Sequence, residues 1–304
     1  MTLWTHYHSP ATIDEALELL RSYQGRARVI AGGTDLLLDI RQGHTPRPEA
    51  LIDVTCIQGF NAIRQDGDTL LIGAGVTHTQ IVKSPLIVAR ATCLVESCGV
   101  VGGPQVRNVG TLGGNVAHAL PAGDGTTSLV AFDAEVEIVK DGQRRWVPIR
   151  DVYVGPGQSL LDPTRDLLID FRLRLCGAHE ATAFKRIMRP QGVALPILGC
   201  AVWVRLDDSG AVVEDVRVCI GPVAKVPTRA DAVETSVRGQ PVSEVTVERA
   251  VAAARESLRP RTSAYRATAD YRREMVNVLL RRVLPLAAQR AKTGQVVPEG
   301  VGME

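Results

Sequence analysis

Residues 102–115 read GGPQVRNVGTLGGN, and residues 122–125 continue the pattern with AGDG. Because glycine has no Cβ, backbone N–H groups in such a stretch can approach a polar ligand closely, and a cluster of them forms a concavity that suits an anion. The same composition is typical of a mobile or tightly turned loop. The run alone leaves both interpretations open, so other parts of the chain have to distinguish them.

A second glycine turn lies near the N-terminus. Residues 28–31 (RVIA) predict a short buried strand, residues 32–35 (GGTD) break it, and residues 36–43 restart as a helix. A strand, a glycine turn and a helix together present free amides and a helix N-terminus, an arrangement that binds phosphate groups. Thr34 or Asp35 also suits the N-cap of the helix, and this structural role is compatible with ligand binding.

The order of strand and helix signals divides the chain into parts. Strands alternate with helices up to about residue 56, and antiparallel hairpins follow, with turn residues at 66–68 and 141–142. Beyond residue 176, three strand candidates in succession predict a small antiparallel sheet. Strands are expected at 51–54, 62–65, 69–74, 134–139, 145–149, 167–173, 182–188, 197–206 and 212–220. Helices are expected at 9–20, where the stretch starts with a capping residue, and at 85–99, 126–132, 243–258 and 264–283. The expected parts are residues 1–56, 57–176 and 177–288, with a loose tail over 289–304.

Composition excludes several functional classes. The chain has 304 residues, of which 45% are hydrophobic, enough for two packed domains. A net charge of +2 and an aromatic content of 4% argue against nucleic acid as the partner. The first residues show no basic segment followed by an apolar run, and no stretch is apolar for long enough to span a bilayer. We therefore expect no membrane span and a cytoplasmic location.

The cysteines do not form a metal motif. None of the six belongs to a Cys-x-x-Cys pair, and Cys93 with Cys98 would need a third cysteine where Val101 stands to match the plant-type ferredoxin spacing. We expect free buried thiols in a reducing compartment, and neither an iron–sulfur cluster nor zinc. No nucleophile with an organised base is apparent, so no side chain is assigned a catalytic role.

Residues 73–78 (GAGVTH) resemble the start of a dinucleotide fingerprint. His78 occupies the place of the third glycine, and no acidic residue follows at the expected strand end, which argues against a Rossmann site. We interpret His78 as a polar residue at a helix start rather than as a base.

Positive charge is concentrated near the C-terminus. From Arg249 to Lys292 there are eleven Lys or Arg residues against three Asp or Glu residues. A solvated helix face explains this strip, and a docking surface for an acidic partner is the alternative.

The two glycine segments, taken in this order, resemble those of the FAD-binding medium subunit in the xanthine dehydrogenase and carbon monoxide dehydrogenase family of molybdenum hydroxylases. The first segment is residues 31–36 (AGGTDL), and the second is residues 106–117 (VRNVGTLGGNVA), which continues into residues 121–124 (PAGD). Residues 73–77, and 184–186 (FKR) with Arg189, also fall where the family has them. The resemblance extends over residues 2–285, and the two motifs together are far more specific than either alone.

The resemblance implies an α+β fold. A two-part FAD domain of the vanillyl-alcohol oxidase (PCMH) type, which is not a Rossmann fold, would precede a small C-terminal domain with an antiparallel sheet and helices. FAD would lie extended between the two parts, with backbone amides and the Thr34 and Thr111 hydroxyls on its pyrophosphate. Lys185 is a candidate for a position near the flavin or its acceptor, and a solvated lysine is the other interpretation. The implied cofactor-binding residues are Ala31, Gly32, Gly33, Thr34, Asp35, Leu36, Val106, Thr111, Gly113, Gly114, Asn115, Ala117, Gly123, Asp124, Ile169 and Lys185.

The resemblance also implies partners. In such complexes a large molybdopterin subunit hydroxylates a substrate, a small subunit with two 2Fe–2S clusters relays the electrons, and the flavin delivers them to an acceptor. The expected assembly is a dimer of heterotrimers. The cysteine-bearing insertion of the hydroxybenzoyl-CoA reductase branch has no counterpart in this chain.

Several positions depart from the family pattern. His118 and Leu120 stand where the family often has Asn and Ser. Gly157 replaces an aromatic residue that often follows the Gly-Pro of the loop, which leaves Tyr153 as a candidate to cover the flavin ring.

Two further hypotheses remain beside an electron-transfer subunit. A free-standing flavin oxidase acting on its own substrate would need a general base or a histidine bound covalently to the flavin, and the six histidines are too scattered to indicate one. A scaffold that has lost its flavin is the third hypothesis.

Overall fold

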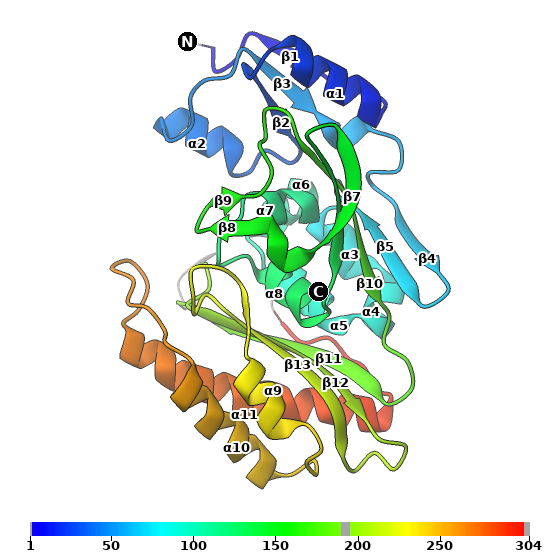
Figure 1. The fold of residues 1–304 in the computed structure, drawn as a ribbon, viewed down its shortest axis with the longest axis vertical. Helices are drawn as coiled ribbons and strands as arrows, with labels where there is room; N and C mark the ends of the chain where they lie inside the picture. Colours follow the sequence, from blue (N-terminus) through cyan, green and yellow to red (C-terminus); the bar gives the residue numbers. More distant parts are fainter. Residues whose placement is uncertain (1, 190–194, 301–304) are drawn as a thin grey trace.

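The computed structural model of the chain describes residues 2–189 and 195–300. The N-terminal part (blue) and the C-terminal helices (orange and red) lie at opposite ends of the molecule, with a group of short helices between them (Figure 1). Three main sheets organise these layers. The glycine segments belong to the region between the first sheet and the third.

The N-terminal part is a small parallel sheet with two helices. Its elements are β1 (His6–His8), α1 (Ile13–Ser22), β2 (Ala27–Ile30), α2 (Leu36–Gln42) and β3 (Ala50–Asp53), followed by the short 3-10 helix η1 (Val54–Cys56). The strands pair in the order β1-β3-β2, so both helices are crossover connections. Thr12 caps α1 by accepting a hydrogen bond from the Glu15 N–H, and α1 buries Ala16, Leu17 and Leu20.

The second sheet is antiparallel and joins two hairpins. Its strands are β4 (Ile63–Asp66), β5 (Thr69–Gly73), β6 (Glu135–Lys140), β7 (Gln143–Pro148) and β10 (Leu167–Arg174). They pair in the order β4-β5-β10-β6-β7, with β10 between the two hairpins. Asp141 and Gly142 have φ values of 52° and 77°, the conformation of the two-residue turn that the sequence predicts there. The 3-10 helix η2 (Ile149–Val152) and a small hairpin of β8 (Tyr153–Gly155) and β9 (Gln158–Ser159) precede β10.

Six short helices connect β5 to β6. They are α3 (His78–Lys83), α4 (Pro85–Arg90), α5 (Thr92–Gly99), α6 (Pro104–Val109), α7 (Leu112–Ala117) and α8 (Asp124–Ala131). The single helix expected over 85–99 is therefore two helices. The glycine-rich stretch, which the sequence suggests is a loop, contains α6 and α7, because Pro104 begins one and the Thr111 hydroxyl caps the other.

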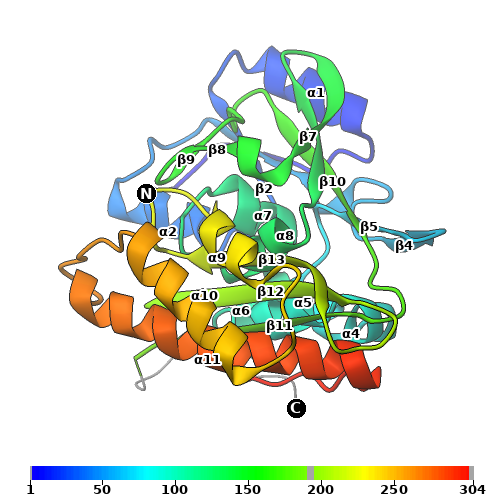
Figure 2. The same ribbon diagram turned by 60° about the horizontal axis from the view of Figure 1, so that its bottom comes forward.

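The third sheet lies between two layers of helices. Its strands are β11 (Glu180–Ile187), β12 (Leu198–Leu206), β13 (Val213–Gly221) and β14 (Thr228–Arg229), and the helices that follow are α9 (Asp231–Val237), α10 (Glu244–Ser257) and α11 (Ala269–Thr293). Alternate residues face opposite layers: Phe184 and Trp203 pack into the core shared with the first two sheets, against α5 and α8, whereas Ala183 and Val202 pack against α9–α11. Figure 2 shows α10 and α11 side by side across this second face.

A buried ion pair ties the last helix to the central helices. The Glu96 carboxylate accepts hydrogen bonds from the Arg290 guanidinium at 2.7 Å and from the Phe184 N–H at 2.7 Å, and the Glu299 N–H donates at 2.9 Å. The side chains of Glu96 and Arg290 are 0% and 3% exposed. Burial raises the pKa of Glu96, and Arg290 opposes this shift.

The end of the chain differs from the sequence expectation. The last helix was expected at 264–283 with a loose tail from residue 289, whereas α11 begins after its Thr268 cap and continues to Thr293. Gly294, with φ of 68°, ends the helix. Residues 289–293 are therefore helical. The burial of the Arg290 side chain against Glu96 holds this part of the helix in place.

Replacing Glu96 by Gln is expected to lower the free energy of unfolding by about 3–5 kcal/mol, because Arg290 then remains buried without its counter-charge. Glu248→Gln is the matched control. Glu248 forms a two-bond pair with Arg281 at 2.6 and 2.8 Å, but both side chains are about half exposed, so its loss should cost far less than the loss of the buried pair. Urea unfolding of both variants measures the difference, and equal losses would contradict a structural role for the buried pair.

Candidate functional site

The two glycine segments meet backbone to backbone. A Cβ on Gly32 would lie 2.0 Å from the Val109 carbonyl oxygen and 2.9 Å from the Gly110 Cα, closer than any real side chain could approach. Gly32 follows β2 in the N-terminal sheet, whereas Val109 ends α6 immediately before the Thr111 turn. The contact brings the first glycine segment, residues 31–36, against the second, residues 106–117, and the two together are called the glycine site below.

The first segment presents unused amides. Gly33 has φ of +67°, a left-handed conformation that glycine adopts at little cost. Within the described residues, no hydrogen bond is donated by the N–H groups of residues 32–35. The Thr34 hydroxyl makes only a long contact of 3.5 Å with the neighbouring Asp35 carboxylate. Ala31 and Leu36 flank this turn on the strand and helix sides, so the turn can present several donors to one anion.

The second segment is folded tightly onto the second sheet. The Gly113 N–H donates to the Ala74 carbonyl at 3.0 Å, and a Cβ on Gly113 would lie 2.5 Å from that oxygen. The Ala74 N–H donates in turn to the Ile169 carbonyl at 2.9 Å, so Ile169 supports the segment from beneath through its backbone. The Val106 side chain packs directly against Gly102, where it would lie only 2.7 Å from a Cβ on that residue. It thereby fixes the turn at Gly102 that precedes α6.

Thr111 and Gly114 form the cap of α7. The Thr111 hydroxyl accepts from the Gly114 N–H at 3.0 Å and keeps its own proton for a further acceptor. Gly114 and Ala117 are exposed on the outer side of this short helix, while Thr111 is only 3% exposed. The hydroxyl thus holds the backbone of the second segment in place.

Asn115 and Asp124 bring unmatched polar atoms to the same region. The Asn115 Oδ1 is buried and has no hydrogen-bond partner in the described residues, and a Cβ on Gly123 would lie 3.1 Å from it. Asp124 begins α8, where the N–H groups of residues 124–126 donate no bond within the described chain. An orphaned buried oxygen beside free amides indicates a place where a ligand completes the hydrogen bonding.

Asp124 is held by a residue from the third sheet. Its Oδ2 accepts a hydrogen bond from Arg186 Nη1 at 2.7 Å, and both side chains are less than a tenth exposed. The Oδ1 of Asp124 is buried without a partner in the described residues. Burial raises the pKa of Asp124 to about 7, while the Arg186 charge and hydrogen bond oppose the shift.

Three further residues that the sequence singled out make contacts within the chain. Lys185 pairs with Glu299, and strand alternation puts it on the face of β11 opposite Arg186 and Asp124. Tyr153, proposed as a cover for the flavin ring, is instead 7% exposed in the core and bonds the Thr126 hydroxyl at 2.7 Å. His78 begins α3, as expected for a polar residue at a helix start, and burial lowers its pKa to about 4.

Two arginines were not singled out for the site. Arg186 holds Asp124, and the buried Arg107 donates to the carbonyls of Val101 and Gly102 and so closes the turn before α6. Alternation along strand 180–187 could have indicated Arg186, because it shares a face with the apolar Phe184 and therefore points inward. No sequence signal identifies Arg107, since its carbonyl partners depend on the local backbone.

The groups of the glycine site and of the neighbouring start of α8 fit a dinucleotide flavin. Free amides on residues 32–35 and 124–126 suit a pyrophosphate, and the orphaned oxygens of Asn115 and Asp124 suit the donors of a sugar or a flavin ring. The glycines at 32 and 113 leave no space between their neighbours for a Cβ, so they fix how closely the segments pack.

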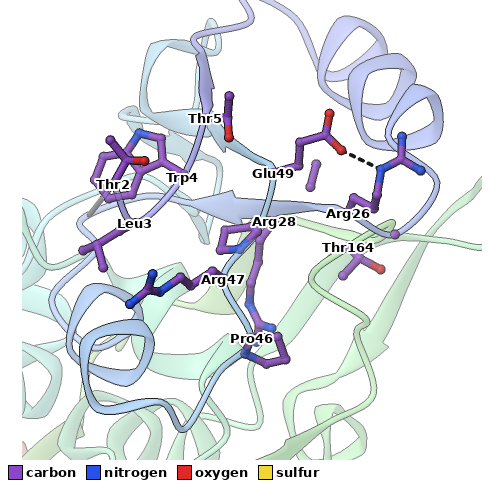
Figure 3. A pocket seen from close by; sticks show the side chains of 13 residues that line it. Thr2, Leu3, Trp4, Thr5, Arg26, Arg28, Pro46, Arg47, Glu49 and Thr164 are labelled. Atoms are coloured by element: carbon purple, nitrogen blue, oxygen red, sulfur yellow. Dashed lines mark hydrogen bonds and ion pairs between the residues drawn. The ribbon is translucent and has the colours of Figure 1, made fainter.

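A separate pocket lies at the outer end of the N-terminal sheet (Figure 3). It has a volume of about 600 Å³ and is lined by residues that include Trp4, Arg28 and Arg47. The Arg26–Glu49 ion pair, 2.6 Å long, closes one side. None of the predicted site residues lines this pocket, so it is distinct from the glycine site.

Family models match both halves of the chain. The FAD binding domain in molybdopterin dehydrogenase matches residues 3–173, and the CO dehydrogenase flavoprotein C-terminal domain matches residues 182–287. The carbon monoxide dehydrogenase medium chain of Hydrogenophaga pseudoflava is 30% identical over 93% of this chain and 97% of its own length. The putative xanthine dehydrogenase FAD-binding subunit XdhB of Escherichia coli K12 is 29% identical over 94% and 96%.

Solved structures agree with these matches. A carbon monoxide dehydrogenase from Hydrogenophaga pseudoflava, which lacks the Mo-pyranopterin moiety of its cofactor, superposes with a TM-score of 0.86 at 30% identity and covers 94% of this chain and 98% of the other. Quinoline 2-oxidoreductase from Pseudomonas putida 86 gives a TM-score of 0.86 at 25% identity, covering 95% and 98%.

These comparisons confirm the fold class and the cofactor expected from the sequence: an FAD-binding domain is followed by a C-terminal flavoprotein domain, and FAD is the cofactor. In the part of the chain that the structure describes, no helix is both long and apolar enough to cross a membrane. The chain belongs to the FAD-binding medium subunits of the molybdenum hydroxylase family, together with the flavoprotein subunits of carbon monoxide and xanthine dehydrogenases.

Proposed function

We propose that this subunit passes electrons from iron–sulfur clusters of a partner chain, through its FAD, to an external acceptor. Bound FAD supplies the redox chemistry, because it can take up two electrons and release them again. The residues of this chain bind the cofactor, orient it and limit its contact with water. No side chain of the glycine site is required as a nucleophile or base.

The contact between Gly32 and Val109 is the observation that carries this proposal. It joins two segments that are far apart in the sequence, and each presents backbone donors or a capped turn at the same place. A ligand that spans both segments has to be extended and to carry several acceptors, as a dinucleotide does.

We assign FAD contacts to the residues that the structure gathers there. The first segment, from Ala31 to Leu36, and Thr111 with the Gly113–Asn115 turn would hold the pyrophosphate. Asp124, fixed by Arg186 at 2.7 Å, would accept from a polar group of the cofactor through its unmatched oxygen. Val106, Ala117, Gly123 and Ile169 would shape or support the same surface.

We also propose domain limits at residues 1–56, 57–176 and 177–288.

The partners are proposed from the relatives. The name of one relative describes it as the medium chain of a carbon monoxide dehydrogenase, and a solved structure with a TM-score of 0.86 is described as a Cu,Mo-CO dehydrogenase. We propose that this chain assembles with a large molybdopterin subunit and a small subunit with two 2Fe–2S clusters, as a dimer of heterotrimers in the cytoplasm.

Replacing Gly32 by Ala is expected to abolish FAD retention, because the new methyl group collides with the Val109 backbone and separates the two segments. Gly177→Ala is the matched control, since its Cβ would meet only the Glu180 carboxylate at 3.7 Å. The flavin absorbance per purified chain measures retention, and circular dichroism reports whether each variant is folded. Full flavin occupancy in a folded Gly32→Ala variant would contradict the site.

Affinity purification of the tagged chain, co-expressed with its neighbouring genes, is expected to recover a molybdopterin-containing chain and an iron–sulfur chain. Two 2Fe–2S clusters per flavin correspond to roughly four iron atoms per FAD. Metal analysis of the purified complex measures the ratio of iron to FAD, and mass spectrometry identifies the partner chains. A chain that is isolated alone, carries FAD and oxidises a substrate of its own would overturn the electron-transfer proposal in favour of a free-standing oxidase.

A further inference from the structure

A second pocket opens beside the glycine site. It has a volume of about 670 Å³, and residues 120–122, which lead into Asp124, form one of its walls. The segment between α10 and α11, drawn in orange in Figure 1, supplies another wall and extends towards the β8–β9 hairpin. Four arginines line this pocket, Arg189, Arg261, Arg266 and Arg272, and it is therefore called the arginine pocket.

The positive charge of the arginine pocket is not neutralised by the chain around it. Within residues 2–189 and 195–300, no carboxylate lies within ion-pair distance of any of the four guanidinium groups. The negative charge of Asp124 acts on Arg266 from beyond ion-pair distance, but the Asp124 carboxylate already pairs with Arg186 at 2.7 Å. Four unpaired guanidinium groups around one cavity therefore favour an anionic occupant.

Arg272 has an unused donor that supports this conclusion. Its side chain is 2% exposed, and its Nη1 donates to the carbonyls of Pro222 at 3.2 Å and Arg261 at 3.0 Å. Its Nε is buried and has no acceptor among the described residues. A buried donor without a partner costs free energy, which an oxyanion in the pocket would recover.

The electrostatics of the arginines point the same way. Burial lowers the pKa of Arg272, and the neighbouring positive charges of Arg266 and Arg261 lower it further. Burial also lowers the pKa of Arg266. Arg272 is thus close enough to Arg266 and Arg261 to be repelled by both, and a bound anion would relieve this repulsion.

The other lining residues of the pocket indicate the chemical character of the uncharged part of the ligand. The pocket also has apolar lining residues, namely Leu120, Pro121, Leu195, Ile197 and Pro222. Tyr265, with 86% of its surface exposed, stands at the rim, where its backbone carbonyl accepts from Arg189 at 2.6 Å. A small molecule with one charged end and one uncharged, largely apolar part matches these walls better than an inorganic ion alone.

We propose that the arginine pocket binds the phosphate, or a comparable oxyanion group, of the small-molecule acceptor that takes electrons from the FAD of this subunit. The assignment of the ligand as an acceptor rests on the function proposed above, and the shared wall of residues 120–122 places such a ligand next to the cofactor segment. Reduced FAD gives up two electrons, the acceptor gains them, and the protons released pass to the acceptor or to water. The guanidinium groups bind the ligand and take no part in this transfer.

Inorganic pyrophosphate is the probe for the oxyanion, measured by isothermal titration calorimetry on the FAD-loaded chain. With FAD bound, the glycine site is filled and does not compete for the probe. The double variant Arg261→Gln, Arg266→Gln is expected to bind pyrophosphate about tenfold more weakly or worse, because charge-assisted hydrogen bonds are lost. Arg145→Gln, Arg282→Gln is the matched control, since both residues are exposed and unpaired within the described chain, and its affinity should equal that of the unmodified protein.

Electron transfer gives a second readout with charged acceptors. In stopped flow, the double variant should slow the reoxidation of the reduced, FAD-loaded chain by anionic ferricyanide, of which two ions each take one electron. Reoxidation by a ferrocenium cation should not slow. Pyrophosphate should inhibit the ferricyanide reaction of the unmodified chain and not that of the double variant.

The outcomes separate the two proposals. A chain that retains no FAD refutes the proposed function before the pocket is tested. A chain that retains FAD but binds no pyrophosphate, or binds it equally well in both double variants, refutes the arginine pocket alone. Weaker assembly with the partner chains in the Arg261, Arg266 variant, with no effect on pyrophosphate, would also refute it and would identify the arginines as contacts for acidic groups of a partner.

Discussion

The structure depends on one close contact between main chains. Gly32 and the Val109–Gly110 peptide lie so near each other that a single methyl group cannot be placed between them. A contact of this kind gives no hydrophobic stabilisation of its own, and its value is geometric. It fixes the N-terminal sheet, which carries the first glycine turn, against the group of short helices, which carries the second. The proposed cofactor site requires both turns to be held at this distance.

Among the charged contacts of the described residues that attach the third sheet to this arrangement, two are almost fully buried. Arg186 on β11 fixes the carboxylate at the start of α8, and Glu96 on α5 binds the Arg290 guanidinium and the backbone of β11. Each pair is almost fully buried, so removing one partner should be costly even where the complete pair adds little net stability. The C-terminal domain therefore supports the proposed flavin site, and through the segment before α11 it also forms a wall of the arginine pocket.

Much of this organisation could be predicted from local patterns. Glycine turns, hairpin dipeptides and strand alternation indicated the positions of most strands, and the paired motifs at residues 31–36 and 106–117 indicated the family. The helices α6 and α7 could not be read in the same way, because glycine has a low helix propensity and the Thr111 cap overrides it only in the folded context. The contacts of Lys185 and Tyr153 could not be predicted either. Strand phase and burial, which tertiary packing decides, give Lys185 an ion pair with Glu299 and Tyr153 a buried bond with Thr126.

The central claim is that both glycine segments close on the same FAD molecule. Hydrogen–deuterium exchange of the chain, before and after FAD is restored, tests it most directly because free amides exchange rapidly unless a ligand accepts from them. The account predicts that peptides covering residues 31–36 and residues 111–126 both gain protection, with the same dependence on FAD concentration. Protection of only one of the two peptides, with the other unchanged at saturating FAD, would contradict it.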